Sequence, residues 1–365
     1  MAVLSTLQHI FPPPKYITLP NIGVDISDTS LKYIQFERKR SHDKNLVLKR
    51  WGDIEIPSGV VEHGTVQDVA KLTQVLQELK KHCDTEYVRV SLPEERAYLF
   101  ETKLDRGTPV KEMRGLLEFK LEENVPLSPR EVYFDYDVVE GDGNHLHVTV
   151  AVYSKDAINS YYNACREAGL IPLSFEIEAQ AIARATVRAG LDGTYMVIDF
   201  GKTRMGVGIV HKGSLMYTSS VDVGGLSLSD AIRSVLGDLA ESEITKIKNT
   251  QGILNTEANH EVYQALSSIM SVIEEEIKTR IHYWDTRDAD PSERQIEKIF
   301  LCGGSANLAG LPEHLSQSLG IPTELAQVWQ NAFSLETFIP PITRRYSFGY
   351  ATAIGLGLTD FLDSV

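Results

Sequence analysis

Two short stretches decide the fold: VDISDT at residues 24–29 and IDFGKT at residues 198–203. In each, an aspartate ends an apolar run, a small residue stands two positions later and a threonine four positions later. A turn of this kind directs backbone N–H groups and a hydroxyl at an anion, while the aspartate can hold a water bound to a cation. Either stretch alone is typical of a tight polar hairpin. Their repetition predicts two related lobes whose turns clamp a polyphosphate with Mg²⁺.

The pattern around the two stretches is repeated as well. In the first half, strands are expected over residues 22–26, 31–36 and 46–56, with an amphipathic helix over residues 66–82. In the second half, strands are expected over residues 195–200, 205–211 and 214–221, with helices over residues 229–235 and 261–283. The strands are predicted from β-branched residues and the helices from apolar residues at helical spacing. A run of strands followed by helices, occurring twice, predicts two α/β lobes.

Composition narrows the class of protein. The 365 residues carry a formal net charge of −14, which argues against a nucleic-acid partner because binding one requires lysine and arginine to neutralise phosphates. The three cysteines are odd in number and form no C-x-x-C pair, so a reducing compartment is expected rather than a disulfide framework. The opening residues have no basic n-region, and no apolar run approaches the ~20 residues of a membrane span, so no direct membrane insertion is expected.

Two glycine-rich stretches complete the candidate site. In IFLCGGSANLAG at residues 299–310, an apolar strand runs into two glycines, where backbone can approach a flat ligand closely. In VGGLSLS at residues 223–229, glycine backbone precedes a helix N-terminus, a geometry that suits a terminal phosphate. The GKT at residues 201–203 is not expected to be a Walker loop, because Met196 stands where the first glycine of that loop is needed.

In this order and spacing, the four segments resemble the phosphate and adenosine motifs of the superfamily of actin, sugar kinases and heat-shock chaperones. The resemblance implies a nucleotide cleft between the lobes, with ATP and Mg²⁺ as ligands. It places Lys32 at the β-phosphate, Glu178 on a connecting helix as a water-positioning residue, and Lys248 beside the adenine and ribose. Asp25, Glu178 and Asp199 are expected at the catalytic centre. Asp25 and Asp199 are also expected at the magnesium ion, through water.

The nucleotide-binding residues that the resemblance implies come from all of these segments. They are Ser27, Thr29, Ser30, Lys32, Gly201, Lys202, Thr203, Gly224, Gly225, Lys248, Gly303, Gly304, Ser305 and Asn307. The chain departs from the superfamily at the second turn, where Lys202, Arg204 and Met205 replace small residues and a second threonine. These departures imply a protein that binds ATP and is at most a slow ATPase.

Within the superfamily, the chain is similar to the PilM group of type IV pilus assembly proteins over nearly its whole length. The similarity rests on GVDIS at residues 23–27, on residues 117–126 and 131–138, and on LGIP at residues 319–322. It implies a cytoplasmic scaffold that is peripheral at the inner membrane because it binds the N-terminal cytoplasmic peptide of a PilN-like protein. The pilus motor ATPase and further copies of the chain are additional candidate partners that the resemblance implies.

The expected fold is α/β, with two actin-like (ribonuclease-H-like) lobes around a nucleotide cleft and an inserted α+β subdomain in the first lobe. PilM proteins share such an insertion with the division protein FtsA. The expected domains are residues 1–94 for the N-terminal part of the first lobe, 95–172 for the inserted subdomain, 173–190 for the connecting helix, 191–345 for the second lobe and 346–365 for a C-terminal helix that packs back on the first lobe. A hairpin of residues 132–139 and 146–153 is expected to offer an open edge to a partner peptide.

Two alternatives remain open. A filament-forming actin-like protein of the cytoskeleton or of cell division is the first. Those that anchor themselves like FtsA end in a basic amphipathic helix. Residues 358–365, LTDFLDSV, are acidic and too short a stretch for such a helix, which weakens this alternative. The second is a small-molecule kinase of the same superfamily, which needs a substrate pocket with a positioned aspartate base. The sequence contains no motif for that base, and turnover assays against small alcohols distinguish this alternative.

Overall fold

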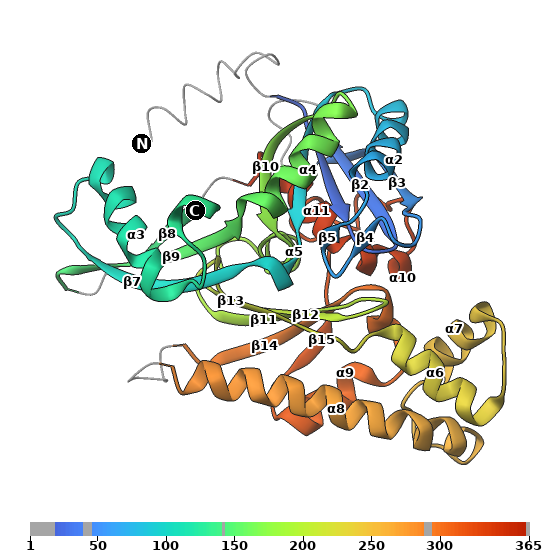
Figure 1. Cartoon of the computed structure of the whole chain (residues 1–365). Coiled ribbons are helices and arrows are strands. Elements are labelled where there is room, and N and C mark those ends of the chain that lie inside the picture. Colours follow the sequence, from blue (N-terminus) through green and yellow to red (C-terminus); the bar gives the residue numbers. More distant parts are fainter. Residues whose placement is uncertain (1–18, 39–45, 141–142, 288–293, 363–365) are drawn as a thin grey trace. The chain divides into compact units, whose positions relative to one another are not determined.

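The computed structural model describes residues 19–38, 46–140, 143–287 and 294–362. They form two compact units, drawn in Figure 1. The first unit contains the described residues of Met1–Ala189, Trp329–Pro341 and Thr352–Val365, and the second contains those of Gly190–Val328 and Ile342–Ala351. The chain therefore leaves the first unit twice and returns to it twice.

Each unit is built on a five-stranded sheet, and the two sheets have the same strand order. In the first unit the order is β3-β2-β1-β6-β10, with bounds Val47–Glu55, Ser30–Glu37, Ile22–Ile26, Tyr87–Leu92 and Ile171–Ile177. In the second unit it is β13-β12-β11-β14-β15, with bounds Ser214–Val221, Met205–His211, Thr194–Phe200, Ile296–Cys302 and Thr323–Leu325. In both, a three-stranded antiparallel meander is extended by two parallel strands. The prediction of two related α/β lobes is confirmed.

The two repeated stretches of sequence form the same backbone turn. In the first unit, the N–H of Ser27 donates to the carbonyl of Ser30 at 3.0 Å. In the second, the N–H of Gly201 donates to the carbonyl of Arg204 at 2.9 Å. Each donor stands two positions after the repeated aspartate, so the sequence repeat is also a repeat of structure.

The helices of the first unit outside the inserted subdomain are α2 (Val69–His82), α4 (Lys155–Glu167), α5 (Glu178–Thr186) and α11 (Ala351–Leu358), and a short hairpin, β4 (Val61–Glu62) with β5 (Thr65–Val66), precedes α2. Helix α2 begins after Asp68, whose carboxylate accepts the N–H of Lys71 at 2.9 Å and so caps the first turn. Its apolar face, including Leu72, Leu76 and Leu79, is buried at helical spacing. Helix α2 lies beside α4 (Figure 1).

Helix α11 packs in close contact with β1 and α5. A Cβ atom added to Gly23 in β1 would lie 2.2 Å from the carbonyl oxygen of Ala353. One added to Gly355 would lie 1.7 Å from the carbonyl oxygen of Ala181 in α5. No side chain fits at either distance, so glycine at both positions is what lets the strand and the two helices touch.

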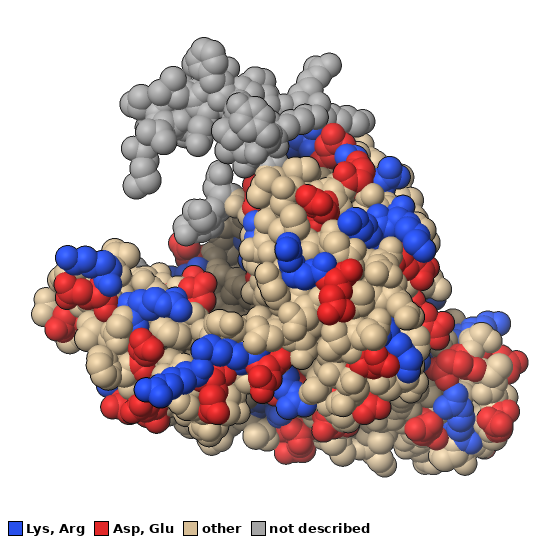
Figure 2. Space-filling model, turned by 45° about the horizontal axis from the view of Figure 1, so that its top comes forward, with Lys and Arg blue, Asp and Glu red and all other residues tan. Residues whose placement is uncertain are grey.

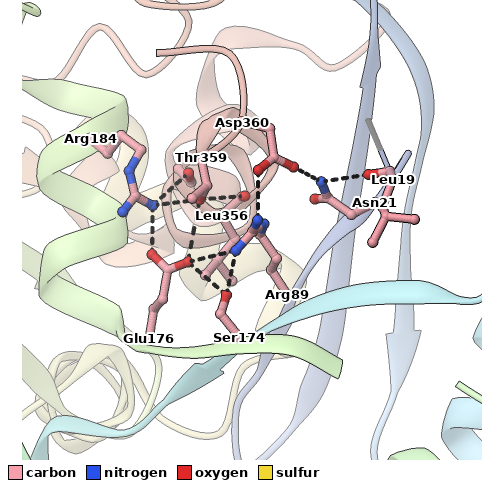
Figure 3. A network of polar contacts seen from close by, with 10 residues as sticks. Leu19, Asn21, Arg89, Ser174, Glu176, Arg184, Leu356, Thr359 and Asp360 are labelled. Atoms are coloured by element: carbon pink, nitrogen blue, oxygen red, sulfur yellow. Dashed lines mark hydrogen bonds and ion pairs between the residues drawn. The ribbon is translucent and has the colours of Figure 1, made fainter. Parts of the chain in front are cut away.

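A polar network holds the chain just after α11 against the first unit (Figure 3). Arg89 of β6 forms an ion pair with Asp360 at 2.6 Å, and Arg184 of α5 forms one with Glu176 of β10 at 2.7 Å. Arg184 also donates to the hydroxyl of Thr359 at 2.9 Å. The side chains of both arginines are less than one fifth exposed, at 15% and 19%. Arg89 also lies 3.8 Å from Glu176, so removing Glu176 would leave the shielded charge of Arg184 without its acid.

A subdomain is inserted in the first unit between β6 and α4. It consists of a three-stranded antiparallel sheet of order β7-β9-β8 and of helix α3, with bounds Tyr98–Asp105, His145–Ser154, Val132–Glu140 and Val110–Asn124. The sequence predicted a helix over residues 109–125, where α3 lies, and the hairpin of β8 and β9, but not β7. Because β7 pairs with β9, the open edge of that hairpin belongs to β8 alone.

Helix α3 covers one face of this small sheet (Figure 1). Met113, Leu117 and Leu121 are buried in a core that also contains Val148 and Val150. The three helical residues are spaced by four and therefore form one row along the helix. The side of α3 opposite this row faces away from the sheet.

The helices of the second unit are α6 (Gly225–Leu236), α7 (Glu241–Thr250), α8 (His260–Asp285), α9 (Leu311–Leu319) and α10 (Arg344–Ser347). The prediction that α6 starts at residue 229 is wrong, because the helix already begins at Gly225. No helix was predicted where α7 lies, and a helix without bounds was predicted after the two glycines, where α9 lies. Helix α7 buries only Ile244 and so shows a weak apolar period, whereas α9 buries Leu311 and Leu315 at helical spacing.

On the face drawn in Figure 2, acidic and basic side chains are interspersed rather than gathered by sign. This face therefore has no broad basic area of the kind that binds a nucleic-acid backbone. Within the described part of the chain, no helix combines the length and apolar character needed to cross a bilayer.

Candidate functional site

In the second unit, the glycine-rich stretch before α6 lies directly on the β11–β12 turn. The N–H groups of Gly225 and Leu226 donate to the carbonyl oxygens of Gly201 and Lys202, at 3.0 and 2.9 Å. A Cβ atom added to Gly224 would lie 2.5 Å from the backbone of the turn, so this approach requires glycine. The carbonyls of the turn therefore satisfy two N–H groups that a helix start otherwise leaves open.

The second glycine-rich stretch reaches the same turn from the end of β14. The hydroxyl of Ser305 donates to the carbonyl of Gly201 at 2.9 Å. A Cβ atom on Gly225 would lie 2.2 Å from the Oγ of Ser305. Gly303 has a φ of +86°, and a Cβ there would lie 2.2 Å from the Oδ1 of Asp199. Segments after β11, before α6 and after β14 thus meet at one place in the second unit.

Lys248 of α7 reaches this place with its ammonium group. Its Nζ donates to the carbonyl of Gly225 at 3.2 Å and to the hydroxyl of Ser229 at 2.8 Å, and lies 3.7 Å from a carboxylate oxygen of Glu241. Burial lowers the pKa of Lys248, Glu241 opposes that effect, and the positive charge of Lys202 lowers the pKa further. An anion bound here would be stabilised by both ammonium groups.

Glu241 is held by two further residues that the sequence analysis did not single out. The hydroxyl of Ser229 donates to one carboxylate oxygen at 3.1 Å, and Arg233 donates to the other at 2.5 Å. Burial favours the neutral form of Glu241, but Arg233, Ser229 and Lys248 together lower its pKa. Ser229 and Arg233 stand four residues apart on α6, a spacing that many helices show and that alone indicates no site.

In the first unit, Asp25 is only 8% exposed and accepts the hydroxyl hydrogen of Ser91 at 3.1 Å. The same hydroxyl accepts the N–H of Ile26 at 3.1 Å, so it fixes both the carboxylate and the backbone beside it. Burial raises the pKa of Asp25, whereas the charge of Lys32 and the hydrogen bond from Ser91 lower it. Ser91 was missed because a single serine in an apolar strand gives no signal in the sequence.

Serine hydroxyls organise the first turn. The Oγ of Ser27 donates to the carbonyl of Ser30 at 3.0 Å and accepts its N–H at 3.2 Å. Lys32 then donates to the Oγ of Ser30 at 2.6 Å, which brings its ammonium group to the turn. Thr29 contributes through its backbone, since its carbonyl accepts the N–H of Ile56 at 3.1 Å.

Glu178 is the first residue of α5. Its charge affects the pKa of Tyr161, as do the charges of two aspartates in and beside the first turn. Burial raises the pKa of Tyr161, and the charges of Glu178, Asp28 and Asp25 add to that rise. Among the described residues, no group of three His, Cys, Asp or Glu side chains is arranged to ligate a metal ion directly. Any cation at Asp25 would accordingly need water or a ligand to complete its coordination.

One of the expected binding residues has a contact of its own within the second unit. The side chain of Asn307 donates to the carbonyls of Gly304 and Arg345, at 3.1 and 2.9 Å, so it connects the loop after β14 to α10. Gly304 and Thr203 are exposed. The structure therefore brings the predicted segments of the second unit together, while Asn307 is engaged within the chain.

Two related lobes with this strand order, each with the same phosphate-type turn, are the fold of the actin-like class of proteins. Within that class, residues 23–361 match the family described as Type IV pilus assembly protein PilM, and the chain belongs to this family.

Two solved structures are similar to the chain. The structure titled PilM-PilN type IV pilus biogenesis complex matches with a TM-score of 0.76 and 21% identity, covering 94% of this chain and 99% of that one. The ethanolamine utilization protein EutJ from Carboxydothermus hydrogenoformans matches with a TM-score of 0.52 and 16% identity, covering 95% of this chain and 90% of that one. At these identities the similarity shows the fold alone.

Proposed function

We propose that this protein is a scaffold of type IV pilus assembly that binds ATP with Mg²⁺ and holds the N-terminal cytoplasmic peptide of a PilN-like inner-membrane protein. Membership of the PilM family supports the assembly role. The PilM-PilN complex, which has the same fold, supports a PilN-like partner. Such a partner would keep the protein at the inner membrane from the cytoplasmic side.

The observation that carries the nucleotide part is the cluster at the start of α6, where the ammonium group of Lys248 donates to the carbonyl of Gly225 and the backbone carbonyl of Lys202 accepts the N–H of Leu226. Two ammonium groups near a helix N-terminus fit the oxygens of a polyphosphate, and Glu241 offsets only one of these charges. Gly304 stands in the segment after β14 that reaches the same turn. A Cβ atom added to Gly304 would touch nothing within 4 Å, which leaves space for a flat adenosine group.

Residues of the first turn are proposed to contribute to the affinity for ATP as well. Lys32 offers a cation for phosphate oxygens, and Asp25 offers a carboxylate for a water bound to Mg²⁺. The raised pKa of Asp25 fits this role, because a nearby cation would favour the ionised form that burial disfavours. Magnesium, when bound, would neutralise phosphate charge.

The proposal is for nucleotide binding with slow hydrolysis at most. The first two N–H groups of α6 already donate to the carbonyls of Gly201 and Lys202, so they do not point at a terminal phosphate. Positioned N–H donors of this kind usually stabilise the charge that develops during phosphoryl transfer. Their engagement within the chain favours a site that holds nucleotide over one that turns it over.

The outer edge of β8 is the proposed docking edge for the PilN-like peptide. Among the described residues, no strand pairs with that edge. Tyr133 and Val138 of β8 are each 45% exposed, so apolar side chains are available beside it. An extended peptide can add a strand there, with main-chain hydrogen bonds for affinity and side-chain contacts for specificity.

Isothermal titration of the full chain with ATP, with and without Mg²⁺, tests the nucleotide part. We expect saturable binding that weakens when Mg²⁺ is removed, because phosphate charge would then be less neutralised. Folded protein that shows no binding at millimolar nucleotide would contradict the proposal. Hydrolysis is checked separately by phosphate release over hours.

The partner part is tested with a synthetic peptide of the cytoplasmic N-terminus of the PilN-like protein from the same organism. We expect binding by fluorescence anisotropy. Methylating alternate backbone nitrogens of the peptide on its pairing side should abolish binding, and methylating the other alternate nitrogens should not. If both methylated peptides bind like the parent, strand addition at β8 is wrong.

A further inference from the structure

The outer face of helix α3 carries an exposed apolar patch that the proposed function does not use. With 3.6 residues per turn, the side of α3 opposite its buried row contains eight residues, which we call the outer face: Lys111, Glu112, Gly115, Leu116, Glu118, Phe119, Glu122 and Glu123. All eight are exposed. The face lies on the helix and is separate from the edge of β8.

Two large apolar side chains stand at the centre of the outer face. Phe119 is 77% exposed and Leu116 is 43% exposed. They are three residues apart on the helix, so their side chains are neighbours and form one patch. Leaving an aromatic ring largely in water gives up the gain of burying it, and adjacent exposed apolar residues mark interaction sites.

Gly115 lies on the same face and has no role within the chain. Glycine in the middle of a helix is less stable than alanine, because its backbone has more freedom to lose on folding. A Cβ atom added to Gly115 would meet nothing within 4 Å, so no packing inside the protein requires glycine here. The missing side chain of Gly115 does, however, leave a notch beside Phe119, which allows the backbone of another helix to approach closely.

The charges around the patch indicate what kind of helix would dock. Four glutamates, Glu112, Glu118, Glu122 and Glu123, and one lysine, Lys111, are on the outer face, and Lys120 forms an ion pair with Glu123 at 2.9 Å. The rim is therefore mainly acidic. Lysine and arginine on a partner would complement it, whereas an acidic partner would be repelled.

A second copy of this chain is a poor occupant. If two α3 helices cross antiparallel at Gly115, Glu112 of one copy stands opposite Glu118 of the other. If they cross in parallel, Glu112 stands opposite Glu112. Like charges at facing positions destabilise either arrangement.

We propose that the outer face of α3 docks a basic amphipathic helix of another protein. The apolar side of that helix covers Leu116 and Phe119, a small residue crosses at Gly115, and its lysine or arginine residues face the glutamates of the outer face. This is an interaction in addition to strand addition at β8, and it does not rest on nucleotide binding.

The test uses the full chain and two labelled 18-residue helical peptides with the same stripe of leucine and alanine, one flanked by lysine and one by glutamate. Fluorescence anisotropy should detect binding of the lysine peptide only. Gly115→Leu and Phe119→Ser should each weaken it at least about tenfold, because one fills the notch and the other removes the central ring. The matched control is Ile339→Ser, which removes an 85% exposed side chain elsewhere and should leave binding unchanged.

Gly115→Ala separates docking from folding. It should raise the melting temperature of the protein by roughly 2–4 °C, since alanine favours the helix and meets no neighbour, and should still weaken the lysine peptide. A variant that is more stable and binds less well cannot owe its loss to unfolding.

Three results would overturn the proposal. The first is that neither peptide binds. The second is that the lysine peptide binds all variants alike, which would assign it to the general negative charge of the protein. The third is that sedimentation shows a dimer that Phe119→Ser dissolves, since the face would then belong to a second copy.

Discussion

The two repeated turns are alike in backbone and different in charge. Asp25 lies opposite Lys32 across β1 and β2, while Asp199 lies at the same register opposite Gly206 across β11 and β12. The first unit thus carries its lysine on the strand, whereas the second carries it in the turn, at Lys202. The repeat therefore specifies the backbone of the turn, and each unit places its lysine in its own way.

The surroundings of the two aspartates differ as well. In the first unit, the hydroxyl of Ser91 on β6 donates to Asp25. In the second, Cys302 of β14 lies opposite Asp199, and a Cβ atom added to the next residue, Gly303, would lie 2.2 Å from the Oδ1 of Asp199. One carboxylate is held by a hydrogen bond from the neighbouring strand, and the other lies against a glycine in a left-handed conformation.

The largest effect is expected from Gly303→Ala. The substitution forces a side chain into a φ of +86° and places its Cβ 2.2 Å from the Oδ1 of Asp199. Strain and overlap together should reduce the free energy of unfolding by at least about 2 kcal/mol, measured by urea denaturation. Gly304→Ala is the matched control, because its Cβ meets nothing within 4 Å and it should change stability little. If both variants lost the same amount of stability, the overlap with Asp199 would not explain the loss at Gly303. The proposed difference between the surroundings of the two aspartates would then be removed.

The next effect concerns Ser91. Ser91→Ala leaves the buried Asp25 carboxylate and the N–H of Ile26 without their hydroxyl, which should destabilise the protein by about 1–3 kcal/mol. Ser91→Cys should lose less, because a thiol fills the same space and is a weak donor. Chemical denaturation and titration with Mg-ATP measure both variants. If Ser91→Ala is as stable as the native protein, this hydroxyl does not hold the first aspartate.

A smaller effect, on binding rather than folding, is expected from the two lysines. Lys32→Ala and Lys202→Ala should each weaken ATP about tenfold, since each removes one charged contact to phosphate. Lys246→Ala is the control, because it removes an exposed lysine from α7 without touching the cluster. Calorimetry of the double variant should give the product of the two losses if the turns act independently. A loss confined to Lys202→Ala would mean that only the second turn binds nucleotide.

The sequence predicted the lobes because their determinants are local. A buried run ending in aspartate, a small residue two positions on and a second strand are enough to specify each turn, and the pattern is written twice. The strand β7 was missed because its residues, Tyr98–Asp105, are exposed or half-buried for most of its length and give no clear alternation.

The candidate site was predictable in its segments and only partly in its side chains. Ser91 and Glu241 act through tertiary contacts, with Asp25 in one case and Lys248 in the other. Nothing in the spacing of these residues along the chain shows that they meet. The start of α6 was misplaced for the same reason, since it depends on carbonyls of a turn more than twenty residues earlier.

The smallest expected effect is a dependence of thermal stability on pH that arises from Asp25 of the first turn. Burial raises the pKa of Asp25 above its ordinary value of 3.8. A carboxyl whose pKa is higher in the folded state favours folding below the unfolded pKa, and this contribution is lost as the pH rises through the folded pKa. The Asp25→Asn side chain cannot ionise. The melting temperature of this variant should therefore match that of the native protein near pH 3.5 and exceed it slightly by pH 7.

Glu118→Gln, which removes an exposed carboxylate from α3, is the control and should show no such divergence. Thermal unfolding from pH 3.5 to 7 without nucleotide is the measurement. Parallel curves for Asp25→Asn and the native protein would mean that ionising Asp25 does not oppose folding, and that the first turn holds its charge as easily as an exposed site does.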